Sequence, residues 1–170
     1  MQMVELDRLA EPYWEELVAG ELEPWGSVGE QLSWRDKTRN VGVRDDSGRL
    51  VAAGGAVLAE VRVGQQSPFQ VAGLGGLIVT RSARGRGLAR LLARHLLVVA
   101  GEFGAQRAML FCRPELTALY RTLGFAPIEA PVCADQPGGR IEMPLPAMWK
   151  LLTGDAGWPP GRVELLGEPF

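Results

Sequence analysis

The sequence predicts one domain of the α/β class, of mixed α+β type, built on a mixed β-sheet. An apolar run at residues 74–79 leads into a glycine-rich turn and a long amphipathic helix. A second apolar run at 107–112 leads into a short helix, and alternating residues on both sides of residues 45–48 (DDSG) predict a β-hairpin. A chain of 170 residues with 46% hydrophobic content is long enough to bury one core.

The N-terminal part is expected to hold two helices, followed by the hairpin. Residues 7–19 and 27–40 have helical periodicity, and the second segment opens with a Ser followed three residues later by a Glu, a capping-box pattern. Residues 21–26 form the loop between them. The hairpin strands are expected at residues 40–44 and 50–63.

The next strand ends at residue 79, and the main helix follows it. Gly73, Gly75 and Gly76 lie inside this strand, which indicates a bulge or the close approach of another backbone. The main helix is expected at residues 88–102. Its apolar face consists of Leu88, Leu91, Leu92, Leu96 and Val99.

The C-terminal third is expected to complete the sheet. After the strand at 107–112, Pro114 starts a helix that Gly124 ends, because Pro favours a first helical turn and Gly the position past the last one. The remaining elements are expected to be short strands near 126–129 and 140–145 and a short amphipathic helix at 147–152.

The turn at Arg84, Gly85, Arg86 and Gly87 predicts a site for a phosphate-bearing cofactor. It combines two glycines, two arginines and the free N–H groups of a helix N-terminus. No Lys-Ser/Thr pair follows, so the turn is not a P-loop, and the third glycine of a dinucleotide fingerprint is absent. Its apolar flanks argue against an RNA-binding tail. A basic capping loop without a ligand is the remaining alternative.

Three segments together resemble the GCN5-related N-acetyltransferases, the GNAT superfamily. They are the strand end Leu77-Ile78-Val79, the turn and helix start Arg84-Gly85-Arg86-Gly87-Leu88-Ala89, and Leu119-Tyr120 with Gly124-Phe125. The resemblance covers about residues 40–145. It implies a mixed sheet with helices on both faces and splayed central strands, and acetyl-CoA as co-substrate without a metal.

The resemblance also implies roles for particular residues. Val79 would supply a backbone N–H for the oxyanion, and Tyr120 would protonate the departing thiolate. No general base is assigned. His95 lies mid-helix, and Glu21, Glu23 and Glu30 could bind or deprotonate an amine but fit solvated surface charges better. A water chain could serve equally well as the base. The cofactor-binding residues would be Leu77, Ile78, Val79, Arg84, Gly85, Arg86, Gly87, Leu88, Ala89 and Tyr120.

Composition excludes several classes of protein. A net charge of −2 gives no overall attraction to nucleic acid or to an anionic membrane, and no apolar stretch approaches the ~20 residues of a bilayer span. Acidic residues among the first seven positions are untypical of a secretory signal. Cys112 and Cys133 lack metal-ligand spacing, so free thiols in a reducing, cytoplasmic location are expected.

The tail is expected to pack on the domain rather than to hang free. Residues 1–153 would form the acetyltransferase domain and 154–170 an added strand or a flap over the acceptor site, with Trp158 and Phe170 near the acceptor. The tail faintly resembles that of aminoglycoside 2′-N-acetyltransferases. The function implied is transfer of an acetyl group to the primary amine of a small molecule. A silent acyl-CoA-binding module, a protein or peptide amine as acceptor, and a homodimer remain open.

Overall fold

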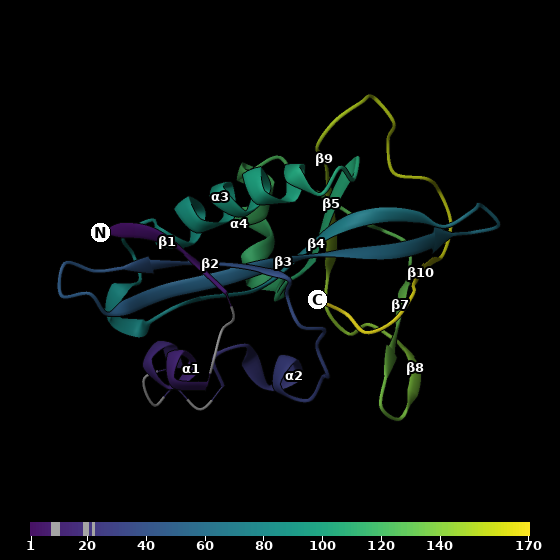
Figure 1. Cartoon of the computed structure of the whole chain (residues 1–170). Helices are drawn as coiled ribbons and strands as arrows, with labels where there is room; N and C mark the ends of the chain where they lie inside the picture. The colour runs from purple at the N-terminus through teal and green to yellow at the C-terminus, as the bar shows by residue number, and fades with distance from the viewer. Residues whose placement is uncertain (8–10, 19–20, 22) are drawn as a thin grey trace.

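The computed structural model describes residues 1–7, 11–18, 21 and 23–170 (Figure 1). Its strands form one mixed sheet with the order β6-β9-β5-β4-β3-β10-β7-β8, and β1 and β2 extend it beside β3. The strands are β1 (Gln2–Leu6), β2 (Arg39–Arg44), β3 (Leu50–Val63), β4 (Phe69–Val79), β5 (Arg107–Phe111), β6 (Ala126–Pro127), β7 (Val132–Gln136), β8 (Gly139–Glu142), β9 (Ala147–Leu151) and β10 (Val163–Leu165).

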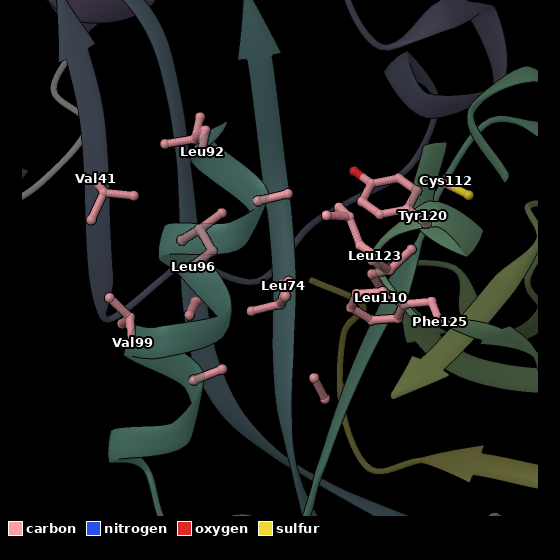
Figure 2. Close-up of a cluster of buried hydrophobic side chains, with 14 of the residues drawn as sticks. Val41, Leu74, Leu92, Leu96, Val99, Leu110, Cys112, Tyr120, Leu123 and Phe125 are labelled. Atoms are coloured by element: carbon pink, nitrogen blue, oxygen red, sulfur yellow. The ribbon is translucent and has the colours of Figure 1, made fainter. Parts of the chain in front are cut away.

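Helices cover both faces of this sheet, as Figure 1 shows. The helices α1 (Glu11–Val18) and α2 (Gly26–Glu30) lie on one face, and α3 (Leu88–Glu102) and α4 (Thr117–Thr122) lie on the other. The apolar stripe of α3 packs in the core with Val41 and Leu74 (Figure 2), except for Leu91, which was expected on this face and is 50% exposed. On the opposite face Leu17 of α1 is fully buried against the sheet. The expected layer arrangement is confirmed.

The two central parallel strands separate after a short pairing. β4 and β5 are in register over only three pairs, from Ala72–Ala108 to Leu74–Leu110. β4 then bulges against β3, where the register shifts between Ala53 and Gly55, and Gly76 takes a φ of +63°. The glycines inside this strand therefore mark the place where the sheet opens.

The last residues of the chain lie inside the sheet rather than on its surface. β10 pairs antiparallel with the end of β3 and parallel with the start of β7. The chain then continues to Phe170, which is 1% exposed. The ring of Phe170 lies where a side chain at Gly73 would project, because a Cβ placed there would be 2.4 Å from the ring. The small residue in β4 makes room for the tail.

Several sequence expectations differ from the structure. The helices expected at 7–19 and 27–40 are shorter, and residues 8–10 and 19–20 lie outside the described part. Residues 33–38 form neither helix nor strand; the backbone N–H of Arg35 donates to Pro169 O (2.6 Å) and that of Thr38 to Ala56 O (3.1 Å). The strands β1 and β7 were not expected.

The helix expected at 147–152 is wrong. These residues form β9, which pairs with all of β5 from Ala147–Phe111 to Leu151–Arg107. A segment of only five residues can match the helical period and the strand period equally well. Pairing with the buried strand β5 makes this segment a strand.

Candidate active site

The glycine-rich turn before α3 is an open backbone cradle. Gly85 and Gly87 have φ values of +77° and +76°, which favour glycine. Gly87 is the N-cap of α3 and makes no side-chain cap hydrogen bond, so backbone donors of the first turn lack a side-chain partner. A Cβ at either glycine would meet nothing within 4 Å. The helix dipole and these N–H groups favour an anionic ligand at this point.

Arg84 links this turn to the opposite side of the site. Its Nε donates to the carbonyl of Val79 (3.0 Å), and its Nη2 pairs with the carboxylate of Glu21 (2.5 Å). The hydrogen bond from Arg84 lowers the pKa of Glu21. Glu21 therefore acts as a partner for this arginine in the structure. Arg86, in contrast, is exposed beside the cradle.

The open edge of β4 carries unpaired backbone groups. The N–H of Thr80 donates to Val51 O (2.9 Å), and Val79 pairs with Ala52. Hydrogen-bonded and non-bonded pairs alternate in an antiparallel ladder, so the N–H of Val79 points away from β3. It faces the side on which β5 has already diverged. The side chain of Ile78, by contrast, is buried on the α1 side of the sheet, where it packs with Leu17 of α1.

Tyr120 lies on α4 at the other side of the opening. Its ring is 7% exposed and packs edge-on against Phe125, with 5.8 Å between ring centroids. Figure 2 shows the hydroxyl pointing away from Leu123 and Phe125. Burial, together with the nearby Cys112, raises the pKa of the phenol well above its usual value. The phenol is therefore fully protonated at neutral pH and can act as a proton donor.

Cys112 lies beside Tyr120, in surroundings that disfavour its reactive thiolate form. Burial raises the pKa of its thiol to about 11, and the charge of Glu115 adds to this shift. Since the thiolate is the reactive form, the thiol stays inert at neutral pH. Cys133 is also free and buried.

A cleft of about 750 Å³ runs through the opening between β4 and β5 and joins the two faces of the sheet. Leu77, Ala93, Leu96 and Tyr120 line it on the α3 and α4 side. On the α1 and α2 side it is lined by Trp14, Trp25 and Trp34 and by the charged residues Asp7, Glu30, Arg35, Asp36, Lys37 and Arg113. The two sides differ in chemistry: the first is apolar, and the second combines aromatic rings with charges.

The structure brings only some of the expected residues to this cleft. Leu77 and Tyr120 line it, whereas residues 84–89 form the cradle at the start of α3. Glu30 lies at its rim, while His95 and Glu23 do not line it. Sequence reasoning missed Lys37, because that residue lay inside a segment expected to be helical. The signal that could have found it is the glycine pair, Gly55 and Gly75, that makes room for it.

Lys37 gives the folded state a defined pH dependence. Burial lowers the pKa of its ammonium group from 10.5 to about 8. Between these values the unfolded chain holds a proton that the folded chain has lost, so this destabilising contribution is present below pH 8 and disappears toward pH 10.5. When the pH rises from 7 to 10, the free energy of unfolding of wild type relative to that of Lys37→Met should therefore increase by about 2 kcal/mol, as measured by urea unfolding. If wild type and Lys37→Met differed in unfolding free energy by the same amount at pH 7 and at pH 10, this expectation would be wrong.

Within the described residues, no helix combines the length and apolar character that crossing a bilayer requires. In the same residues no group of three His, Cys, Asp or Glu side chains is arranged to hold a metal ion.

The opened sheet, the cradle at a helix N-terminus and the cleft between them define an acetyltransferase fold of the GNAT class. The family model described as the acetyltransferase (GNAT) family matches residues 3–125, and the chain belongs to this family.

Two rice proteins (Oryza sativa subsp. japonica) are partial relatives. Glucosamine 6-phosphate N-acetyltransferase 1 is 38% identical over 79 residues, which are 46% of this chain and 47% of the relative. The probable glucosamine 6-phosphate N-acetyltransferase 2 is 43% identical over 49 residues, 29% of this chain and 30% of the relative. The chain therefore spans less than half the length of these curated relatives.

Solved structures share the fold over nearly the whole chain. The GNAT family N-acetyltransferase YhbS from Escherichia coli, in complex with CoA, superposes with a TM-score of 0.64 at 23% identity, over 96% of this chain and 88% of that one. An aminoglycoside 6′-N-acetyltransferase complexed with coenzyme A gives a TM-score of 0.59 at 16% identity, over 92% and 100%. At these identities the likeness concerns the fold alone.

Proposed function

We propose that the protein is an acetyl-CoA-dependent N-acetyltransferase that transfers the acetyl group directly to the primary amine of a small molecule. The observation that carries the proposal is the cleft, which passes through the sheet between β4 and β5. Such a cleft lets a cofactor on one face meet an acceptor on the other. Holding the two reactants together supplies a large part of the rate enhancement.

The cofactor would lie along the open edge of β4. Its pyrophosphate would bind the N–H groups of Gly85, Arg86, Gly87, Leu88 and Ala89, with the Arg86 guanidinium beside them. Its pantetheine arm would run past Leu77 and Val79 toward Tyr120. Arg84 already bonds to Val79 O and Glu21, so its part would be to fix the shape of this turn.

The chemical step would need three groups at the thioester. The backbone N–H of Val79 would stabilise the oxyanion, since it points to the open side of β4. The hydroxyl of Tyr120 would protonate the departing thiolate, since a phenol carries its proton at neutral pH. The acceptor would enter from the α1 and α2 side, among the aromatic rings. No residue is assigned as the general base.

The direct test is the release of free thiol from acetyl-CoA in the presence of a panel of amines. The panel should contain glucosamine 6-phosphate, named for the rice relatives, with aminoglycosides, polyamines, amino acids and short peptides. We expect amine-dependent release and an acetylated amine in the mass spectrum. No release with any amine, while acetyl-CoA still raises the melting temperature, would instead support a binding module. Release without an acetylated amine would mean that water takes the acetyl group, and it would contradict transfer to an amine.

A further inference from the structure

The side chain of Lys37 lies in a space that two paired glycines leave open. Gly55 of β3 is the cross-strand partner of Gly75 of β4. A Cβ on Gly55 would be 2.6 Å from the Cβ of Lys37, and one on Gly75 would be 2.9 Å from its Cε. The stem of the lysine thus crosses from β3 to β4 over the sheet, at the bulge where the cleft passes through. Any side chain at either glycine would displace it.

The ammonium group of Lys37 has hydrogen-bonding capacity left over. Its Nζ donates to the backbone carbonyl of Arg35 (2.6 Å), which uses one of three donors. No Asp or Glu in the described part of the chain lies within 4.0 Å of Nζ. The main-chain carboxyl group of Phe170, the last residue, lies against Gly75 beside the Cε of Lys37, but no hydrogen bond or ion pair within 4.0 Å joins it to Nζ. A partly buried cation with a single neutral partner is incompletely satisfied.

The acidic and the basic residues that line the cleft differ in solvent exposure. Its three carboxylate residues, Asp7, Glu30 and Asp36, are exposed, whereas its three cationic residues, Arg35, Lys37 and Arg113, are partly buried. Arg113 pairs with Glu115 (3.3 Å), whereas Arg35, like Lys37, donates to a single backbone carbonyl, that of Leu166 (2.9 Å). Of these two cations, Lys37 is the one whose stem crosses the Gly55–Gly75 pair, at the bulge where the cleft passes through the sheet.

We propose that Lys37 binds an oxyanion group of the acceptor, so that the acceptor is an amine carrying a phosphate or a carboxylate. This rests on the proposed acetyl transfer. A charge-assisted hydrogen bond from a partly buried lysine to such a group is stronger than one between neutral groups. The same charge repels acceptors with several ammonium groups, such as polyamines and aminoglycosides. Lys37 therefore selects the acceptor by charge and does not act on the thioester.

The experiment compares acceptors that differ only in the anion. Glucosamine 6-phosphate is paired with glucosamine, and an amino acid with its amide, so that the two pairs separate phosphate from carboxylate. Wild type, Lys37→Met and Lys37→Arg are assayed for kcat and KM. Lys150→Met removes the chain's other lysine, which does not line the cleft, and serves as the matched control.

For the preferred anionic acceptor, Lys37→Met should raise KM by roughly 10- to 100-fold and leave the uncharged partner within about threefold. Lys37→Arg keeps the charge and should retain part of the preference, and Lys150→Met should retain all of it. If wild type shows no preference for the anionic member of either pair, or if Lys37→Met weakens both members equally, the inference is wrong.

Calorimetric binding of the same pairs to the coenzyme A complex separates this inference from the proposed function. Preferential binding of the anionic member that Lys37→Met abolishes, without turnover of any amine, would support the anion site and contradict acetyl transfer. Turnover with equal binding of charged and uncharged members would contradict the anion site alone.

Discussion

Replacing Tyr120 by Phe is expected to lower kcat by about 10²- to 10⁴-fold, the usual contribution of a general acid. The dissociation constant of acetyl-CoA should change by less than about threefold. The ring is buried and packs against Phe125, and Phe keeps these contacts, so only the hydroxyl is lost. Thiol release measures kcat, and calorimetry measures the affinity for the cofactor.

Tyr13→Phe is the matched control. Tyr13 is the chain's other tyrosine; it lies on α1, where the guanidinium of Arg44 stacks over its ring, and it does not line the cleft. This variant should turn over at the rate of wild type. If Tyr120→Phe does the same with every accepted amine, the tyrosine has no part in proton transfer and is a core aromatic only.

The largest effect on stability is expected from the tail. Phe170→Ala should lower the free energy of unfolding by about 3–5 kcal/mol, the usual cost of truncating a buried Phe, because this residue is 1% exposed and packs in a core cluster with Met109 and Phe111. Gly73→Ala should cost about 1–3 kcal/mol, since its Cβ would lie 2.4 Å from that ring. Urea unfolding measures both.

The double variant tests the contact itself. In the double variant Gly73→Ala/Phe170→Ala the new methyl group no longer meets a ring. The loss of unfolding free energy in the double variant should therefore be smaller than the sum of the losses in the two single variants, by at least about 1 kcal/mol. Additive costs would show that Phe170 and Gly73 do not compete for the same space. Removing all residues after Gly154 cannot replace this test. It would also remove β10, which pairs with β3 and β7, so lost turnover would not distinguish an acceptor-site role from unfolding.

Local signals explain what could be predicted from the sequence. The cradle at Gly85 and Gly87 depends on a turn with positive φ and a helix start, and both leave a mark within a few residues. The same holds for Tyr120, whose position is set by a helix that ends at Gly124 (φ +87°). These segments were placed correctly because neighbours in the chain determine them.

Contacts between distant segments explain what could not be predicted. Residues 33–38 follow the tail and β3 through the bonds of Arg35 to Pro169 and of Thr38 to Ala56, so their own helical periodicity is overridden. β9 is a strand because β5 lies beside it. Lys37 lies in this segment, so the bonds of residues 33–38 to the tail and to β3 bring it to the cleft. The lining of the cleft on the α1 and α2 side was therefore hidden from the sequence, while the glycine turn before α3 and the helix that carries Tyr120 were visible in it.

The measurement that tests the central claim most directly is a crystal structure with bound coenzyme A, in which the distance from the thiol sulfur to the Tyr120 hydroxyl oxygen is read. We expect pantetheine alongside Leu77 and Val79, pyrophosphate at Gly85 and Gly87, and a sulfur-to-oxygen distance of roughly 3–4 Å, close enough for proton transfer. A cofactor bound away from the opening between β4 and β5, or a sulfur atom far from Tyr120, would contradict the account.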